Sequence, residues 1–243
     1  MARSVPRSLV LVCMAALPPL GLGGWGHGAS HGREHCPEPT HIQQLPFSGA
    51  PPPPPAAPAT GDYRHQLKAT AHGWPRRDHW CVWVEPTAAD GPGARWELAW
   101  HSAVQAALAR WGTLVPITTV EQRQRAHVLI ERRRPPLRGG RASHGRAELA
   151  LAVVHRGGPP QLEPLVTVQI SPGQRPAAME ATALHELGHA FGLWGHSDQS
   201  NDAMAAVPGA MAVVDLSERD RATFRWLQQQ PGLLHCVAGP CGP

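Results

Sequence analysis

The stretch His185-Glu186-Leu187-Gly188-His189-Ala190-Phe191-Gly192-Leu193-Trp194-Gly195-His196 decides how this chain is interpreted. Residues four apart share one face of a helix, so His185 and His189 can both point at one metal ion. Glu186 is rotated by about 100° from His185, where its carboxylate can reach a metal-bound water without being a ligand. The alternative is a core helix whose histidines happen to be four apart, but burying three ionisable groups without a partner is costly. A metal ion supplies that partner.

The end of this stretch supplies a third ligand. Gly192 can adopt a left-handed conformation and end the helix. The chain can then turn back and place His196 beside the other two histidines. Three protein ligands leave the fourth tetrahedral position of zinc open for water, which is the arrangement of a catalytic site. The pattern therefore predicts one catalytic Zn²⁺ held by His185, His189 and His196.

The HExxH motif, followed by a glycine, a third histidine and a downstream methionine, resembles that of the metzincin zinc peptidases. The closer similarity is to matrixin-like enzymes, in particular to predicted bacterial zinc proteases whose HELGHALG is followed by Trp-Gly-His-Ser and Asp-x-Met. Here the corresponding residues are 185–192, 194–197 and 202–204, and residues 216–225 resemble the family's C-terminal helix. The similarity covers residues 74–232.

One departure from the family motif concerns the third ligand. The gap from Gly192 to His196 is one residue longer than in the usual metzincin motif, and Gly195 in the turn could absorb the extra residue. This longer gap occurs in the bacterial subgroup. Asp198 is the alternative ligand, because a carboxylate can replace the third histidine on zinc.

Met204 lies eight residues after His196, which matches the matrixin spacing for the Met-turn. The resemblance implies that Met204 forms an apolar floor beneath the histidines and is not itself a ligand, with Met211 as the competing candidate. Both methionines could instead simply fill the core. Ala205 follows Met204 and Tyr63 is the only tyrosine, so the tyrosine that follows the Met-turn in some metzincins is absent.

The resemblance also implies the fold class, which is α/β (α+β). A metzincin-type catalytic domain has a twisted, mostly parallel five-stranded sheet with an antiparallel edge strand, an active-site helix, the Met-turn and a C-terminal helix. Residues 147–154 would form that edge strand above the cleft, where an extended peptide or protein substrate can add as a further strand. Matrixins often carry structural calcium in the loop before this strand. Residues 132–146 contain no acidic side chain, so no structural calcium is expected.

Hydrophobic patterns place the elements along the chain. Apolar residues at helical spacing predict a helix over 96–111, and Pro176 suits the first turn of the helix that carries the motif. Ser217, followed three residues later by Asp220, predicts the start of a last helix that ends near residue 231. Short β-branched or apolar runs predict strands at 80–85, 117–120, 127–131, 147–154 and 165–170.

The composition changes on either side of this region. Arg3 and Arg7, followed by an apolar run that prolines interrupt, predict a signal peptide over 1–29 that is too short to span a bilayer. Residues 30–61 are rich in Gly, Pro and His and predict a disordered linker. Residues 62–235 would form the catalytic domain and 236–243 a C-terminal tail. We therefore expect an exported protein, secreted or periplasmic, without stable membrane insertion after signal removal.

The cysteines suggest disulfides. Removal of the signal peptide would take Cys13 and leave four cysteines, for which three pairings are possible. The preferred set is Cys36–Cys81 together with Cys236–Cys241. Cys36 does not match the pro-peptide motif of a matrixin cysteine switch.

Charge and motif together define the expected function. The formal net charge is only +4 and Arg132-Arg133-Arg134 is the only dense basic run, so nucleic-acid binding is not expected. We expect a monomeric zinc endopeptidase in which Glu186 acts as general base and then as general acid. Two alternatives stay open: a non-catalytic zinc-binding or adhesion module of the same fold, and a zinc hydrolase that acts on a non-peptide amide.

Overall fold

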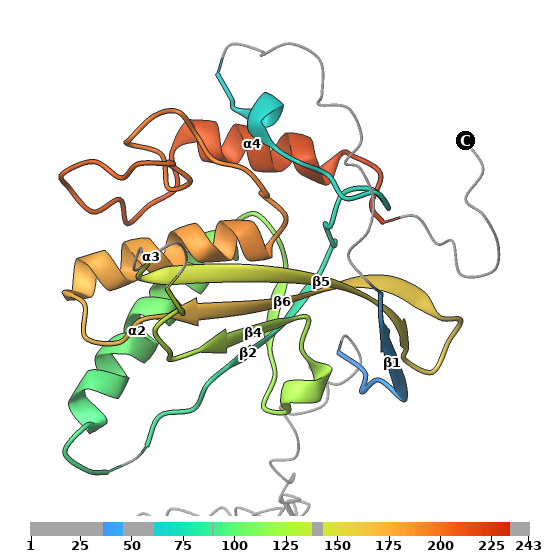
Figure 1. The fold of residues 1–243 in the computed structure, drawn as a ribbon, viewed down its shortest axis with the longest axis horizontal. Coiled ribbons are helices and arrows are strands. Elements are labelled where there is room, and N and C mark those ends of the chain that lie inside the picture. Colours follow the sequence, from blue (N-terminus) through green and yellow to red (C-terminus); the bar gives the residue numbers. More distant parts are fainter. Residues whose placement is uncertain (1–35, 46–60, 89, 138–142, 234–243) are drawn as a thin grey trace, which may run out of the picture.

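The computed structural model describes residues 36–45, 61–88, 90–137 and 143–233 (Figure 1). The expected signal peptide, most of the linker, the C-terminal tail and the Cys236–Cys241 pair lie outside these residues. The described chain is a mixed α/β fold with one six-stranded, mostly parallel sheet. This confirms the expected α/β class.

The sheet has the strand order β1-β5-β6-β4-β2-β3. β2, β3, β4 and β6 are parallel to their neighbours in that group, whereas β5 runs antiparallel to both β1 and β6. The strands are β1 (His41–Gln44), β2 (Trp80–Val84), β3 (Ile117–Thr119), β4 (Val128–Glu131), β5 (Gly145–His155) and β6 (Gln161–Ile170).

Within the described residues, three α-helices accompany the sheet: α2 (Ala94–Trp111), α3 (Pro176–Ala190) and α4 (Glu218–Gln228). Two short 3-10 turns, η1 (Arg64–Gln66) and η2 (Arg123–Arg125), lie in the connections. α2 packs against α3, and α3 lies against β5 and β6 (Figure 1). None of the helices in the described part of the chain has the length and apolar character that a bilayer-spanning helix needs.

Buried tryptophans join the helices to the sheet. Trp100 and Trp111 lie on α2, four and fifteen residues after Trp96, and both are fully buried. The indole N–H of Trp100 donates to the Ile170 carbonyl of β6 at 3.1 Å, and that of Trp111 donates to the Leu184 carbonyl of α3 at 2.9 Å. These large rings therefore contribute burial, and their N–H groups also attach α2 to β6 and to α3.

The sheet has one strand more than expected, because residues 41–44, which we had placed in the linker, form β1. β1 pairs with the second half of β5, in the register His41↔His155 to Gln44↔Ala152. The Leu45 N–H then donates to the Leu151 carbonyl at 2.8 Å. The expected edge strand is thus covered over its second half. The outer edge of residues 145–150 has no strand partner among the described residues.

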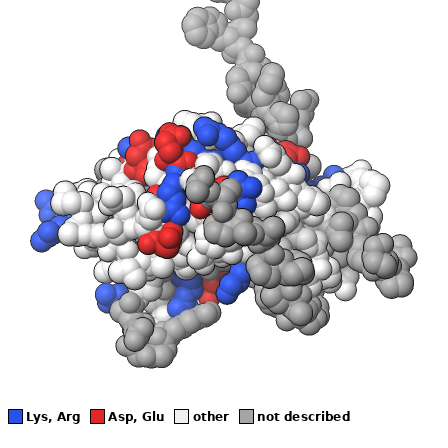
Figure 2. Space-filling view, turned by 90° about the horizontal axis from the view of Figure 1, so that it is seen from above, with Lys and Arg blue, Asp and Glu red and all other residues white. Residues whose placement is uncertain are grey.

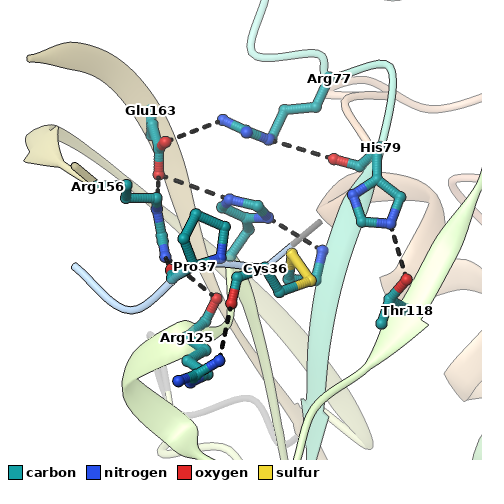
Figure 3. Close-up of a disulfide and its surroundings, with 10 residues drawn as sticks. Cys36, Pro37, Arg77, His79, Thr118, Arg125, Arg156 and Glu163 are labelled. Atoms are coloured by element: carbon teal, nitrogen blue, oxygen red, sulfur yellow. Dashed lines mark hydrogen bonds and ion pairs between the residues drawn. A yellow bond between two sulfur atoms is a disulfide. The ribbon is translucent and has the colours of Figure 1, made fainter. Parts of the chain in front are cut away.

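The segment that carries β1 is attached to the sheet by the Cys36–Cys81 disulfide, which confirms this pairing. Figure 3 shows further contacts around it: the Arg156 guanidinium donates to the Pro37 carbonyl, and Arg125 donates to the Cys36 carbonyl at 3.4 Å. Arg156 also pairs with the buried Glu163 carboxylate at 3.1 Å. The N-terminal segment is therefore held covalently and by buried polar contacts that no local pattern in its sequence indicates.

Candidate metal centre

The three predicted histidines come together at one end of α3. α3 places His185 and His189 one helical turn apart, and the loop after it brings back His196. One ring nitrogen of each lies within 4.8 Å of the others, and the Nε2 atoms of His189 and His196 are 3.2 Å apart. Nitrogen ligands at tetrahedral positions around zinc, each about 2.0–2.1 Å from the ion, lie about as far from one another as these two Nε2 atoms do. The spacing of these nitrogens therefore fits a zinc ion.

Backbone carbonyls orient two of these rings. The Nδ1 of His185 lies 2.8 Å from the Ala203 carbonyl, and the Nδ1 of His189 lies 2.7 Å from the Leu193 carbonyl. A carbonyl only accepts hydrogen bonds, so each Nδ1 carries the proton and each Nε2 presents its lone pair to the cluster. The Trp194 ring stacks on His189 with the ring centroids 5.5 Å apart, which limits rotation of that imidazole.

Burial of His185 and His189, and partial desolvation of the more exposed His196 together with the charge of Lys68, favour the neutral imidazoles that bind metal. Desolvation lowers the pKa of His185 and of His196, and it lowers the pKa of His189 to about 3. Removing the rings from water disfavours the charged imidazolium, and the neighbouring histidines oppose a second charge. The donor set and its protonation thus both fit Zn²⁺.

Glu186 stands beside the cluster on the same helix and is 8% exposed. Burial raises the pKa of its carboxyl to about 7, although a hydrogen bond from the Ala147 N–H and the nearby Arg146 both act to lower it. A methyl group at position 145 would lie 2.6 Å from the Cγ of Glu186, so Gly145 leaves the space that this side chain occupies. We had not identified Gly145 or Ala147 as site residues, although Ala147 begins the predicted strand and Gly145 lies two residues before it.

The loop after the histidines places Met204, and not Met211, at the centre. Met204 is fully buried, whereas Met211 is 82% exposed. A methyl group at position 188 would lie 3.0 Å from Trp111 and closer still to the sulfur of Met204. The glycine between the two helical histidines therefore lets the methionine pack directly beneath them.

Asp198 does not join the three histidines. Its carboxylate accepts a hydrogen bond from Arg219 at 2.7 Å, and its side chain is 61% exposed. Gly192, with a φ of 112°, ends α3 in a conformation that favours glycine. The loop that follows then carries His196 into the cluster, so the structure assembles His196 rather than the alternative carboxylate.

Gly195 lies against the chain segment that follows η1. A methyl group at this position would lie 2.8 Å from the carbonyl carbon of Gln66 and 3.0 Å from the Cα of Leu67. The Lys68 N–H donates to the neighbouring Trp194 carbonyl at 2.8 Å. Gly195 is thus part of a close backbone contact next to His196.

Replacing Gly195 by alanine is expected to destabilise the protein by about 2 kcal/mol, because backbone atoms must move to admit the methyl group. The movement would also displace His196 and weaken zinc binding. Urea unfolding and zinc titration of the variant measure the two effects. Gly158→Ala is the matched control, since no atom lies within 4 Å of the added methyl group. Equal behaviour of the two variants would show that the contact has no such role.

Asp220 connects the Met204 loop to α4. It is fully buried and accepts hydrogen bonds from the Tyr63 hydroxyl at 2.7 Å, from the Ala203 N–H at 2.8 Å and from the Ser217 N–H at 2.9 Å. The last of these, with the Ser217 side chain, forms the capping box that the sequence predicted. The contacts with Tyr63 and Ala203 were missed, because they join positions far apart in the chain.

The histidines and Glu186 open into one cleft. Its walls come from the segment after η1, from the first half of β5, and from the loop that carries His196. The groups on the β5 wall lie along the part of the strand that β1 leaves uncovered. A second group of possible metal ligands among the described residues, Cys36, His79 and Cys81, lies apart from this cleft, and both of its sulfurs are joined in the disulfide.

Comparison with known proteins adds no family assignment. No protein-family model matches the chain, and a search of curated proteins found no significant match. The fold and the site therefore define the protein as a mixed α/β protein with a three-histidine centre and a buried carboxyl group in an open cleft.

Proposed function

We propose that this protein is a zinc-dependent endopeptidase of the metzincin type. The observation that carries the proposal is the convergence of His185, His189 and His196 beside the buried Glu186 carboxyl, in a cleft bordered by an uncovered strand edge. A purely structural zinc site would have no use for that carboxyl group. We further propose that the enzyme is exported, to the medium or the periplasm, and acts as a monomer.

The uncovered edge of β5 suits an extended peptide. Backbone groups of an antiparallel strand point alternately to its two neighbours. The carbonyls of Leu151 and His155 point outward, where they accept from the segment of β1, and the Ala147 N–H points outward to Glu186. The Ser143 hydroxyl already bonds both the N–H and the carbonyl of Gly145, so the outward groups left beside the metal centre are the Ala147 carbonyl and the N–H and carbonyl of Leu149. A substrate strand can pair with them, whereas a compact non-peptide amide gains nothing from this edge.

In this proposal Glu186 moves the proton. A zinc ion at the three histidines would polarise the scissile carbonyl and lower the pKa of the attacking water. Glu186 accepts the proton of that water at its carboxylate and delivers it to the nitrogen of the departing amine. A carboxyl pKa near 7 allows both directions of transfer near neutral pH. No covalent enzyme intermediate is needed.

The test is cleavage of an unfolded, fluorescently labelled protein by the full chain, with and without a zinc chelator, beside Glu186→Gln. Cleavage by the untreated wild type alone, restored by added zinc, is the expected result. Zinc bound in both proteins without any cleavage would overturn the endopeptidase proposal. That outcome would favour a non-catalytic zinc-binding module, and release of ammonia or amine from cell-wall fragments would favour a hydrolase of non-peptide amides.

Zinc is expected to stay bound at about pH 5.5, a full unit below the ordinary histidine pKa. From the motif alone we would expect release near that ordinary value. The lowered pKa of all three ligands means that protons compete for the nitrogens only in stronger acid. Metal content after dialysis at several pH values measures the release, with the urea-unfolded chain as control. Complete loss between pH 7 and 6 in the folded protein would contradict this reasoning.

A further inference from the structure

Lys68 is the only lysine of the chain, and it stands at the metal centre. Its exposed side chain lines the cleft together with the three histidines, and its charge contributes to the lowered pKa of His196. Among the described residues, no carboxylate or side-chain hydrogen-bond partner of its ammonium group is found. Lys68 is therefore a free cation close to where a substrate would lie.

The backbone around Lys68 is held in place. Its N–H donates to the Trp194 carbonyl at 2.8 Å, and Gln66, two residues earlier, is in close contact with Gly195. Leu67 and Ala69, on either side, are buried. The side chain thus starts from a backbone position that is hydrogen-bonded to the loop that carries His196, and only its own flexible stem adjusts to a ligand.

The other charged groups of the cleft wall already have partners. Arg146 donates to the Pro136 carbonyl at 3.0 Å and lies 3.6 Å from Glu148, and Asp198 is paired with Arg219. On the face that Figure 2 shows, basic and acidic side chains are scattered over a mostly uncharged surface. Of the two described cations that line the cleft, Lys68 and Arg146, Lys68 is the one for which no ion pair is found, so it is the candidate for charge recognition there.

We propose that Lys68 binds a carboxylate of the substrate and gives the enzyme a preference for peptides with an acidic group next to the scissile bond. This inference rests on the proposed function. The carboxylate can be an acidic side chain or the C-terminal carboxylate of a peptide. An ammonium group on a flexible stem forms charge-assisted hydrogen bonds with either.

The test uses peptides that differ only by Glu or Gln at one position, with that position moved along the sequence, each as free acid and as C-terminal amide. Binding is measured by fluorescence anisotropy with zinc-loaded Glu186→Gln protein, which holds peptides without cleaving them. At one position the Glu peptide should bind about fivefold more tightly than the Gln peptide, as for a partly exposed ion pair. If the preference depends only on whether the peptide ends in a free acid or an amide, Lys68 binds the C-terminal carboxylate.

The variants decide whether Lys68 is responsible. Lys68→Met should remove the preference, Lys68→Arg should keep it, and Arg95→Met is the control because it removes an exposed cation on α2, outside the cleft. A preference that survives Lys68→Met, or no preference at any position, overturns the inference. Cleavage of the same peptides is compared for the wild type and for Lys68→Met with Glu186 intact. A uniform fall in kcat for Glu and Gln peptides alike also overturns the inference, since Lys68 would then act on the reaction.

The two proposals fail in different ways. If the wild type cleaves unfolded protein in a zinc-dependent manner but shows no charge preference, the endopeptidase stands and the role of Lys68 is wrong. If no substrate is cleaved but the Lys68-dependent difference in binding persists, the carboxylate site stands and the proposed function is wrong.

Discussion

Glu186→Gln is expected to lower kcat by about 10³-fold while the zinc content stays at that of the wild type. Glutamine has nearly the shape of glutamate and can still accept from the Ala147 N–H through its carbonyl oxygen. It cannot take a proton from water at neutral pH, so only the proton transfer is lost. Parallel measurement of turnover and bound zinc separates the two effects. Turnover within a few-fold of wild type would exclude Glu186 as the base.

The same substitution is expected to stabilise the zinc-free protein in alkaline solution. The folded-state pKa of Glu186 is raised to about 7 by burial, above the value of 4.5 for an unperturbed glutamate. The folded state therefore holds the proton more tightly, and stability is lost as the pH rises from 4.5 through 7. Glutamine carries no charge at any pH. At pH 8 the variant should gain at most about 3 kcal/mol, and the gain should vanish in acid.

Urea unfolding of the two zinc-free proteins at pH 8 and at about pH 5 tests this sign. The expected pattern is a difference between the variants at the higher pH only. A gain that is equal at both pH values would come from packing and not from the charge. A loss at pH 8 would show that the folded protein solvates the carboxylate better than its burial indicates.

Removing the Cys36–Cys81 disulfide is expected to cost about 4 kcal/mol in the double variant Cys36→Ala/Cys81→Ala. The bond joins residues that are 45 apart in sequence, and a loop of that length restricts the unfolded chain strongly. In the folded state both cysteines are fully buried, so the reduced thiols gain no solvation there. The loss should appear in the urea midpoint without a large effect on zinc binding.

Treatment of the wild type with a reductant is the matched control for that double variant. Reduction and substitution should lower the midpoint by similar amounts, because both open the same loop. The amide of Leu45, which pairs with Leu151, should also exchange faster with deuterium once the tether is gone. Unchanged midpoints in both experiments would mean that the other contacts of the segment hold it without the bond.

The helices and the pairing of the two helical histidines could be predicted because their signals are local. Apolar spacing indicated α2, the pair Ser217 and Asp220 indicated the capping box of α4, and the spacing of His185 and His189 placed both rings on one helix face. Each of these inferences needs only residues within two helical turns of one another. The α/β class was expected from the family resemblance, and the mostly parallel sheet confirms it.

The parts that were missed depend on contacts between distant positions. β1 has four exposed residues and no alternating pattern, and it pairs with β5 in a segment that the disulfide attaches to Cys81 of β2. Its presence turns the expected edge strand into one that is half covered. Likewise, nothing near Lys68 in sequence indicates the metal centre, because the segment meets Trp194 and Gly195 only in the folded chain.

The bond between Cys36 and Cys81 determines how a nicked form of the protein would behave. A single cut anywhere between these two residues would divide the backbone yet leave both fragments joined through sulfur. Such a species would migrate as one band in a denaturing gel run without reductant and as two bands with it. Without reductant, cleavage in this interval would therefore change the measured mass only by the gain of one water.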